Sequence, residues 1–496
     1  MNAAKRLCVK NWSPTRCAST ISMLSGPTDV PLLRVSMGEH FKSIKAEFGD
    51  SPALISYHQQ KRLTYYELDD LSDKMMAGLA AVGVKKGDRV GACFNNTWEF
   101  GVTSIGIEKL GAILVSINPA LPDNQFKSLL SFATCSTLII SSFLHLPYRP
   151  PRSSLPFLKS LANDLQANQL ECPEVPSLSR IILVGDKPNE RGHLGITDFA
   201  DLLQYEPIPL PALHPDDVIN LQFTSGTTGV AKGAALTHCN ILNNGVHIGR
   251  RMGLRGGSDK VCIPVPVFHC FGLVLGNGAA WGTGSTVVYP AAAFDAKQTL
   301  RCVRDEKCTA LHAVPTMFVG MFEEEKEINR GGFESLRTGI AAGSSIPASL
   351  MSKIHRKLNL IEQVICYGMT ETSPVSAMTQ PDDPLVKRLE TVGTVMPHVQ
   401  IKIVDTNDAI LPIDKHGEIC VAGYLLQKGY WDNPEKTREV MKYDKDGKLW
   451  MYTGDEGALD RDGYLRVTGR IKDLIIRYGI SKAFPNTPEV VKIFIR

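Results

Sequence analysis

Residues 223–233, FTSGTTGVAKG, carry the clearest chemical signal in the chain, because their composition is typical of a loop that surrounds phosphates. Four hydroxyl side chains, three glycines and Lys232 fall within ten residues. Glycine lets the backbone turn with positive φ and approach a ligand, while N–H groups, hydroxyls and an ammonium group can satisfy phosphate oxygens. Residues 218–222 predict a strand before this loop and residues 237–242 a helix after it, which favours an anion site over a surface turn.

Three further motifs follow this loop. YGMTET occupies residues 367–372, YTGD occupies 452–455 and GRIKD occupies 469–473. Together with residues 224–233, this ordered set resembles the signature motifs of the adenylate-forming enzymes, which include acyl-CoA synthetases, aryl-CoA ligases, peptide-synthetase adenylation domains and luciferases. The resemblance extends over about residues 63–477 and is strongest to the mitochondrial medium-chain fatty-acyl-CoA synthetases and related fungal acyl-CoA ligases.

Helical and strand-like segments alternate in the N-terminal part of the chain. Apolar spacing predicts helices over 66–79 and 98–110, and buried strands over 89–94 and 113–117. This order is typical of βα units with a mainly parallel sheet, and 496 residues are too many for one hydrophobic core. With the resemblance, it predicts an α/β protein whose large adenylate-forming region has several subdomains, with parallel or mixed sheets flanked by helices.

The first 28 residues differ from the rest in charge. Lys5, Arg6, Lys10 and Arg16 occur among serines and threonines, and no acidic residue precedes Asp29. This composition is typical of a mitochondrial presequence, although a disordered basic tail of a cytoplasmic protein has the same composition. We therefore expect a presequence over residues 1–28, and a mitochondrial location.

The C-terminal end departs from the family pattern. We expect residues 29–469 to form the large AMP-binding domain, and residues 470–496 to hold the hinge, at Lys472, and a remnant of the small α+β C-terminal domain. The chain reads YGIS at 478–481 where relatives continue with Gly-Gly-Glu-Asn. The resemblance implies that the C-terminal lysine of the family, which stabilises charge during adenylation, has no counterpart here.

The composition is that of an ordinary globular protein. Hydrophobic residues make up 43%, charged residues 21%, and the net charge of +3 indicates no nucleic-acid partner. No apolar run is long enough to span a bilayer. The 12 cysteines have neither paired metal-ligand spacing nor the pattern of a secreted domain, so we expect reduced core thiols. The cysteines in apolar or helical contexts are Cys262, Cys302, Cys308, Cys366 and Cys420.

The resemblance assigns the glycine-rich loop to the β- and γ-phosphates of ATP, with Lys232 as the cation. Glu371 and Thr227 would bind Mg²⁺, for which hard oxygen ligands are suitable, and Thr370 would contact the α-phosphate. An isolated glutamate in a polar loop is usually only solvated, so its motif neighbours carry this interpretation. The loop residues assigned to the phosphates are Thr224, Ser225, Gly226, Thr227, Thr228, Gly229 and Lys232.

The nucleoside is assigned to three other segments. Gly343 and Ser344 resemble the segment that lies against adenine, although a turn before Pro347 explains these residues equally well. Tyr367 belongs to the nucleotide-binding motif. Asp455 would accept hydrogen bonds from the ribose hydroxyls and Arg470 would donate, because a paired acid and base can satisfy a vicinal diol.

His269 matches the aromatic segment that borders the acyl pocket in relatives, which implies a role at the substrate. A histidine in apolar surroundings is also often a core residue with its hydrogen bonds satisfied. The aromatic and sulfur side chains that could line an acyl tunnel, or equally fill the core, are Phe268, Phe271, Trp281 and Met317.

Three functions remain open at this point. The first is an acyl-CoA ligase that uses ATP, Mg²⁺ and CoA to activate a fatty or polyketide-type carboxylic acid through an acyl-adenylate. The second is a nucleotide- and acyl-binding protein without turnover. The third is an adenylating partner that transfers its acyl group to a carrier protein or a polyketide synthase.

Overall fold

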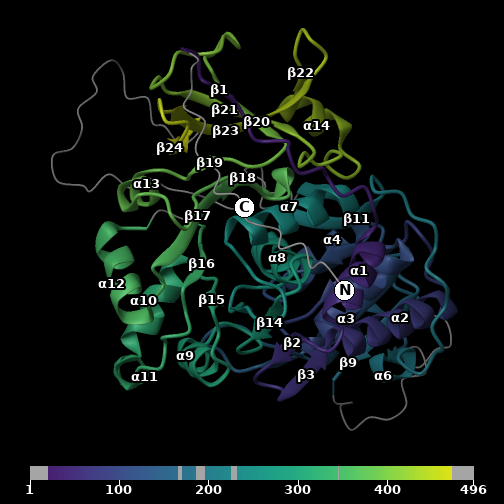
Figure 1. Cartoon of the computed structure of the whole chain (residues 1–496). Coiled ribbons are helices and arrows are strands. Elements are labelled where there is room, and N and C mark those ends of the chain that lie inside the picture. Colours follow the sequence, from purple (N-terminus) through teal and green to yellow (C-terminus); the bar gives the residue numbers. More distant parts are fainter. Residues whose placement is uncertain (1–19, 166–169, 186–195, 225–231, 344–345, 472–496) are drawn as a thin grey trace, which may run out of the picture.

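The structure is a computed structural model of the chain, and it describes residues 20–165, 170–185, 196–224, 232–343 and 346–471. Within these ranges, two large sheets with parallel centres form the body of the molecule, and a third, antiparallel sheet lies beside them (Figure 1). This architecture confirms the predicted α/β class. No helix in the described ranges is long and apolar enough to cross a bilayer.

The first large sheet is built from alternating strands and helices. Its strands pair in parallel from β10 to β11, and β12 pairs antiparallel with β11. The helices α2 (Tyr65–Ala81) and α3 (Trp98–Leu110), with β4 and β5, confirm the alternation predicted from apolar spacing. In spatial order the strands are β10 (Ile196–Asp198), β9 (Arg180–Val184), β6 (Thr137–Ser141), β4 (Arg89–Cys93), β5 (Ile113–Ser116), β11 (Val218–Thr224) and β12 (Lys232–Thr237).

The second large sheet also has a parallel centre, which runs from β17 to β2, and its outer strands are antiparallel. In spatial order its strands are β19 (Thr394–Val395), β18 (Val375–Met378), β17 (Glu362–Gly368), β16 (Thr338–Ala341), β15 (Ala310–Leu311), β13 (Lys260–Cys262), β14 (Thr286–Tyr289), β2 (Pro52–Ser56) and β3 (Lys61–Thr64). Its accompanying helices are η1 (Phe271–Gly278), α8 (Ala279–Gly282), α9 (Ala296–Asp305), α10 (Pro315–Glu323), α11 (Glu325–Arg330) and α12 (Ala348–Leu358).

A single hydrophobic core joins the two large sheets. It contains Val90 and Leu114 of the first sheet, Leu54 and Val287 of the second, and Ile105 of α3. The helix α7 (His238–Arg251) is buried at 13 of its 14 positions, which is expected of a helix covered on all sides. It begins at a capping box formed by the side chains of Thr237 and Asn240.

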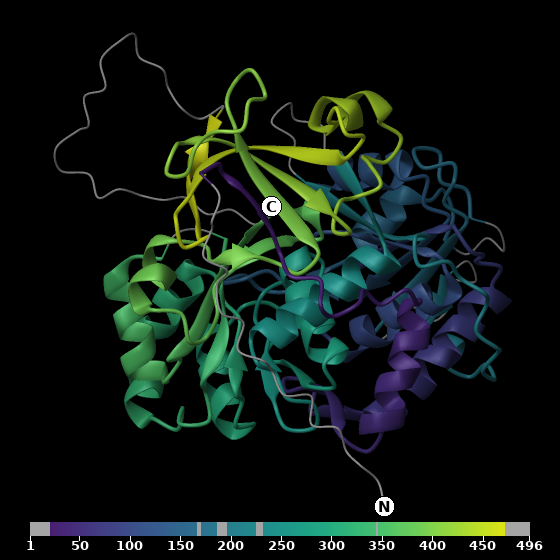
Figure 2. The ribbon, with the colours of Figure 1, turned by 45° about the horizontal axis from the view of Figure 1, so that its top comes forward.

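The third sheet joins the two ends of the described chain. Its strand β1 comes from the N-terminal segment and pairs antiparallel with β20, and Figure 2 shows the purple N-terminal segment running beside the green and yellow strands. The strands are β1 (Met23–Ser25), β20 (Val399–Val404), β21 (Gly417–Gly423), β23 (Leu449–Leu459), β22 (Met441–Tyr443) and β24 (Leu465–Arg470). The remaining elements are α1 (Met37–Phe48), α4 (Asp123–Phe132), α5 (Leu155–Leu161), α6 (Phe199–Leu202), α13 (Leu385–Glu390), α14 (Pro434–Val440), β7 (Phe143–Leu144), β8 (Arg152–Ser153) and η2 (Thr370–Thr372).

The predicted strand over residues 218–222 and helix over residues 237–242 are confirmed as β11 and α7. One local element was missed, because β12 lies between the glycine-rich loop and α7. The loop therefore joins two antiparallel strands, and the N-terminus of α7 is separated from it by a whole strand. The sequence of β12, KGAALT, contains few β-branched residues, so its strand signal is weak.

The structure adds detail at both predicted domain ends. Strand β1 lies within the predicted presequence of residues 1–28, and Ser22 beside it is fully buried. Strand β24 includes Arg470, so the expected boundary after residue 469 falls inside a strand. Lys472 and the remnant expected after it lie outside the described residues, as do residues 1–19.

Candidate active site

The glycine-rich loop connects the antiparallel strands β11 and β12. Thr224, the last residue of β11, is buried and lies opposite Lys232, the first residue of β12. The antiparallel register therefore brings the two ends of the loop together, although seven residues separate them in the chain. The loop positions outside the described residues are Ser225, Gly226, Thr227, Thr228 and Gly229.

Lys232 faces a tyrosine that sequence reasoning missed. Its Nζ lies 5.1 Å from the ring centroid of Tyr430, a distance at which a cation and an aromatic face attract each other. The hydroxyl of Tyr430 donates a hydrogen bond of 2.7 Å to Oε1 of Glu371. We refer to Lys232, Tyr430 and Glu371 as the Glu371 cluster.

The segment that carries Tyr430 is held by backbone hydrogen bonds on two sides. The N–H of Trp431 donates to the carbonyl of Gly233 at 2.7 Å, and the N–H of Ala235 donates to the carbonyl of Gly429 at 3.0 Å. On the other side, the N–H of Gln427 donates to the carbonyl of Glu371 at 2.9 Å. Residues 427–431 therefore connect β12 to the short 3₁₀ helix η2.

Helix η2 presents Thr370 and Glu371 at the end of β17. Both side chains are buried, with exposed fractions of 2% and 4%. The turn is held by Thr372, whose hydroxyl donates to the carbonyl of Pro374 at 2.7 Å, and by Ser373, whose hydroxyl donates to the carbonyl of Leu425 at 2.6 Å. Two predicted site residues, Glu371 and Lys232, are thus brought together by Tyr430, although they are far apart in the chain.

A second group of predicted residues meets at the other end of the YGMTET motif. The hydroxyl of Tyr367 donates to Oδ2 of Asp455 at 2.8 Å, and Nε of Arg470 lies 3.6 Å from Oδ1 of the same carboxylate. Asp455 and Arg470 face each other across β23 and β24. Burial raises the pKa of Tyr367, so its hydroxyl remains a donor at neutral pH. We refer to Tyr367, Asp455 and Arg470 as the Asp455 cluster.

The backbone before Asp455 is shaped by a glycine. Gly454 has a φ of 73°, in the left-handed region that glycine adopts without strain, and its N–H donates to Oε1 of Glu418 at 2.9 Å. The N–H of Asp455 donates to the hydroxyl of Thr453 at 3.1 Å. These contacts hold the carboxylate in place toward Tyr367 and Arg470.

The predicted adenine segment is described only at its start. Gly343 follows β16 with a φ of 94°, and a Cβ atom at this position would lie 3.1 Å from Cγ1 of Val314. Glycine suits this position for both reasons. Ser344 lies outside the described residues, so the contact of this segment with adenine stays a prediction.

His269 lies near η2, because the next residue in the chain, Cys270, contacts that helix. Sγ of Cys270 is 3.7 Å from Oγ1 of Thr370, so this segment contacts the YGMTET motif. Nδ1 of His269 accepts a hydrogen bond of 3.2 Å from the N–H of Phe271. Burial lowers the pKa of His269 to about 4. The imidazole is therefore neutral at physiological pH, with its proton on Nε2.

The candidates for the acyl tunnel have different positions. Phe271 begins η1, a π-helix, and its ring lies 6.0 Å from that of His312. Trp281 is a core residue, because its Nε1 donates to the carbonyl of Ala53 at 2.9 Å and the indole is nearly buried. Phe268 and Met317 are partly buried. Phe271 and Trp281 are therefore both buried in the core, whereas Phe268 and Met317 are only partly buried.

Comparison with known proteins shows the family of the chain. Residues 41–431 match the AMP-binding enzyme family. The chain is 39% identical over 475 residues to the acyl-CoA ligase sidI of Aspergillus fumigatus, covering 94% of this chain and 78% of that protein. It is 34% identical over 474 residues to the mitochondrial medium-chain acyl-CoA ligase ACSF2 of Danio rerio, covering 93% of this chain and 76% of that protein.

The fold is similar to that of the anthranilate CoA ligase AuaEII in complex with anthranoyl-AMP. The TM-score is 0.77 at 24% sequence identity, and the match covers 91% of this chain and 81% of that one. The chain therefore belongs to the AMP-binding enzyme family and is an acyl-CoA ligase, which activates a carboxylic acid with ATP through an acyl-adenylate and transfers the acyl group to CoA.

Proposed function

We propose that the motif from Tyr367 to Glu371 holds ATP between the two clusters. The Asp455 cluster would bind the ribose and the Glu371 cluster the phosphates. The observation that carries this proposal is that one short segment contacts both clusters: Tyr367 hydrogen-bonds Asp455, and Glu371, four residues later, hydrogen-bonds Tyr430 beside Lys232. A ligand with a diol at one end and phosphates at the other fits such a pair of clusters.

Each cluster offers the chemistry that its part of the nucleotide needs. The carboxylate of Asp455 can accept hydrogen bonds from ribose hydroxyls, while Arg470 beside it can only donate. Negative charge develops on the phosphate oxygens when a substrate carboxylate attacks the α-phosphorus and pyrophosphate leaves. Lys232 and the hydroxyl of Thr370 would stabilise that charge, because they are held in place before the reaction.

Mg²⁺ is suited to the Glu371 cluster. The carboxylate of Glu371 is buried, and its two oxygen atoms are hard ligands. Tyr430 fixes the orientation of Oε1. Glu371 would hold the ion, with Thr227 as the second predicted ligand. When bound, Mg²⁺ would supply positive charge that offsets part of the charge on the phosphates.

The acid substrate would enter beside His269. Because the imidazole is neutral and its Nδ1 is already occupied by the N–H of Phe271, the Nε2–H is available as a donor. We propose that this donor orients the carboxylate near Thr370. The relatives favour a medium-chain aliphatic acid, since ACSF2 of Danio rerio is named a medium-chain acyl-CoA ligase.

We also propose a mitochondrial location, supported by the basic, acid-free residues 1–28 and by the mitochondrial relative. A fluorescent protein fused to residues 1–28 is expected to enter mitochondria. The same fusion with Lys5, Arg6, Lys10 and Arg16 changed to glutamine serves as the control. Cytosolic fluorescence of the unchanged fusion would contradict the proposal.

The proposed site is tested by acid-dependent release of pyrophosphate across a panel of short, medium and aromatic carboxylic acids. Lys232→Ala is expected to lower the rate by about 100- to 1000-fold, because one preorganised cation is lost. Lys428→Ala, an exposed lysine on the segment that carries Tyr430, is the matched control and should retain the rate.

Mass spectrometry of the products identifies the acyl acceptor. Formation of the acyl-CoA from the preferred acid is the expected result. If pyrophosphate is released but the acyl group is transferred only to an added carrier protein, the acyl acceptor is that carrier and not CoA. Binding of ATP without pyrophosphate release from any acid would contradict it and favour a binding protein without turnover.

A further inference from the structure

Cys262 meets two cysteines of a later segment, Cys302 and Cys308, in the core. The Sγ atoms of Cys262, Cys302 and Cys308 all lie within 4.8 Å of one another, and each side chain is fully buried. We refer to these three residues as the cysteine cluster. Within the described part of the chain, it is the only group of three or more histidine, cysteine or acidic side chains close enough to share a metal ion.

Local structure explains how the three thiols converge. Cys262 is the last residue of β13, and Cys302 lies on α9, which packs on this sheet. Lys307, with a φ of 51°, ends α9 in a left-handed turn, so that the N–H of Cys308 donates to the carbonyl of Val303 at 3.0 Å. This turn directs Cys308 back toward Cys302, before the chain enters β15 beside β13.

The spacing of the sulfur atoms suits a three-coordinate ion. A metal–sulfur bond of about 2.3 Å places three sulfurs roughly 4 Å apart around a central ion, which agrees with the cluster. Thiolates are soft ligands that select monovalent copper and zinc. Zinc in structural sites almost always takes four ligands, and the described residues supply only three here, so monovalent copper fits better.

A cationic side chain lies near the cluster. Lys260, two residues before Cys262, is close enough to Cys308 for their charges to interact. Nζ of Lys260 is held by the carbonyl of Glu306 at 2.9 Å. A three-thiolate site with a monovalent ion is an anion overall, and Lys260 can balance part of that charge.

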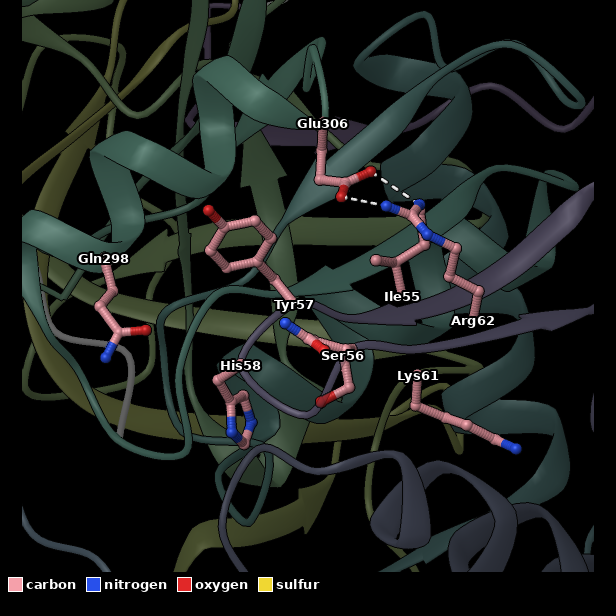
Figure 3. Close-up of a pocket in the computed structure, with 9 residues that line it drawn as sticks. Ile55, Ser56, Tyr57, His58, Lys61, Arg62, Gln298 and Glu306 are labelled. Atoms are coloured by element: carbon pink, nitrogen blue, oxygen red, sulfur yellow. Dashed lines mark hydrogen bonds and ion pairs between the residues drawn. The ribbon is translucent and has the colours of Figure 1, made fainter.

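A surface cavity lies near the cluster, since its lining includes Glu306, two residues before Cys308 in the chain. The cavity of about 490 Å³ is lined by Tyr57, Arg62 and Glu306, among others (Figure 3). Arg62 donates to Glu306 at 2.9 Å, as the dashed lines in Figure 3 show, and Tyr57 donates to Oδ2 of Asp305 at 2.5 Å. The pKa values of Tyr57 and Arg62 are raised chiefly by these hydrogen bonds, and Cys302 lies close enough to add to both shifts.

We propose that Cys262, Cys302 and Cys308 form a binding site for a thiophilic d¹⁰ metal ion, and that monovalent copper is the ion it binds best. Binding would form three metal–sulfur bonds and release the protons that the thiols carry. The ion would tie the end of α9 to β13 at the edge of β15. This site is separate from the Glu371 and Asp455 clusters.

The test uses the full chain, reduced and free of metal, under anaerobic conditions. Monovalent copper is titrated in competition with the chelator bicinchoninate, and one ion per chain is expected. Cys302→Ser and Cys308→Ser should each weaken binding by at least about 100-fold, since a direct ligand matters no less than its surrounding groups. The matched control is Cys135→Ser, which should bind copper like the unchanged chain. Cys135 is a buried free cysteine just before β6 of the first large sheet.

Two further measurements keep the test independent of folding defects in the variants. Cd²⁺ bound to the unchanged chain should show the thiolate charge-transfer absorption of three sulfur ligands, and X-ray absorption of the copper form should show three sulfurs. Copper binding that is equal in the unchanged chain and in Cys302→Ser would overturn the site. Tighter binding of Zn²⁺ than of monovalent copper would overturn the choice of ion, and a disulfide within the cluster of the metal-free chain would overturn both.

Discussion

The Asp455 cluster and the Glu371 cluster are assembled in different ways. Asp455 and Arg470 face each other across two consecutive strands, and Tyr367 joins them from the second large sheet. The Glu371 cluster combines a hairpin end, a 3₁₀ turn and a loop whose Tyr430 is 59 residues from Glu371. The comparison teaches that motifs identify the residues proposed to face ATP, while the residues that orient them can come from segments without any motif.

The two clusters also differ in how firmly their charged groups are held. Asp455 is buried between a tyrosine hydroxyl and an arginine, and its backbone is fixed by Gly454 and Thr453. Lys232 is only half-buried, and a flexible lysine is held less firmly by an aromatic face than by a carboxylate. We therefore expect the Asp455 cluster to be the more rigid of the two, and Lys232 to rely on Tyr430 for its position before the phosphates bind.

Apart from Lys232→Ala, the largest effect is expected from Glu371→Gln. Loss of the charge should lower kcat for pyrophosphate release by about 100-fold or more, because an electrostatic group acting on the phosphates is removed. The Mg²⁺ concentration needed for half-maximal rate should rise in the same variant. Glu435→Gln, an exposed glutamate on α14, is the control. An unchanged Mg²⁺ dependence would show that Glu371 does not hold the ion.

Asp455→Asn should have the next largest effect, and on a different kinetic constant. Hydrogen bonds to a charged group contribute about 1.5–3 kcal/mol, so KM for ATP is expected to rise roughly 10- to 100-fold with a smaller change in kcat. Steady-state kinetics at varied ATP measures this, with Asp446→Asn in an exposed loop as the control. If Asp455→Asn lowers kcat and leaves KM for ATP unchanged, the Asp455 cluster does not act on ATP binding, and the two clusters do not differ in the kinetic constant that they affect.

A pair of smaller changes separates the two supporting tyrosines. Tyr430→Phe and Tyr367→Phe each remove one hydroxyl donor to a carboxylate, which we expect to reduce kcat/KM by roughly 5- to 10-fold. Tyr430→Phe should act mainly on kcat and Tyr367→Phe mainly on KM for ATP.

A double-mutant cycle sharpens this result. Tyr430→Phe combined with Glu371→Gln should add little to Glu371→Gln alone, because both changes break the same contact. Tyr430→Phe combined with Asp455→Asn should be additive. Additivity in both combinations would show that Tyr430 acts on Lys232 or on the fold, and not through Glu371.

The smallest effect concerns His269, which lies outside both clusters. Its pKa of about 4 is below the usual value, so between these values the unfolded chain binds more protons than the folded chain. The contribution of His269 to stability is therefore complete above about pH 6.5 and decreases as the pH falls toward 4. His269→Gln should flatten this acid-side decrease in thermal unfolding experiments.

The same pKa predicts that titration of His269 does not shape the activity profile near neutral pH. The ratio of the rates of His269→Gln and the unchanged chain should stay constant within about twofold from pH 6 to 8. A ratio that changes steeply in this range would mean that His269 becomes charged during catalysis.

Local signals predicted much of the body of the molecule. The apolar spacing of α2, α3, β4 and β5 is a property of neighbouring residues, and it was sufficient to indicate βα units. Strand β12 was missed because its alanines and glycine carry little strand preference, and pairing with β11 determines its conformation.

The long-range contacts could not be predicted in this way. Tyr430 follows a glycine in an unremarkable turn, and only the pairing of residues 428–431 with β12 brings it to Glu371. The cysteine cluster gives no familiar spacing signal either, since Cys262 and Cys302 are 40 positions apart. A metal pattern is recognised in sequence when its ligands share one loop or helix, and here Cys262 lies on β13, far from the segment that carries the other two.

The sequence by itself determined which residue types are proposed for each part of the nucleotide: hydroxyls, glycines and a lysine for phosphates, a glutamate for a hard metal ion, and an aspartate with an arginine for a diol. These assignments rest on the charge and the hydrogen-bonding capacity of the side chains, which are known from the sequence without the fold. The tertiary structure alone decided which of them act together, where Tyr430 supports them, and that three thiols share one buried space. The reason is that burial and strand pairing bring together segments that are hundreds of residues apart, such as β1 and β20. The separation of two segments in the sequence does not show whether they meet in the fold.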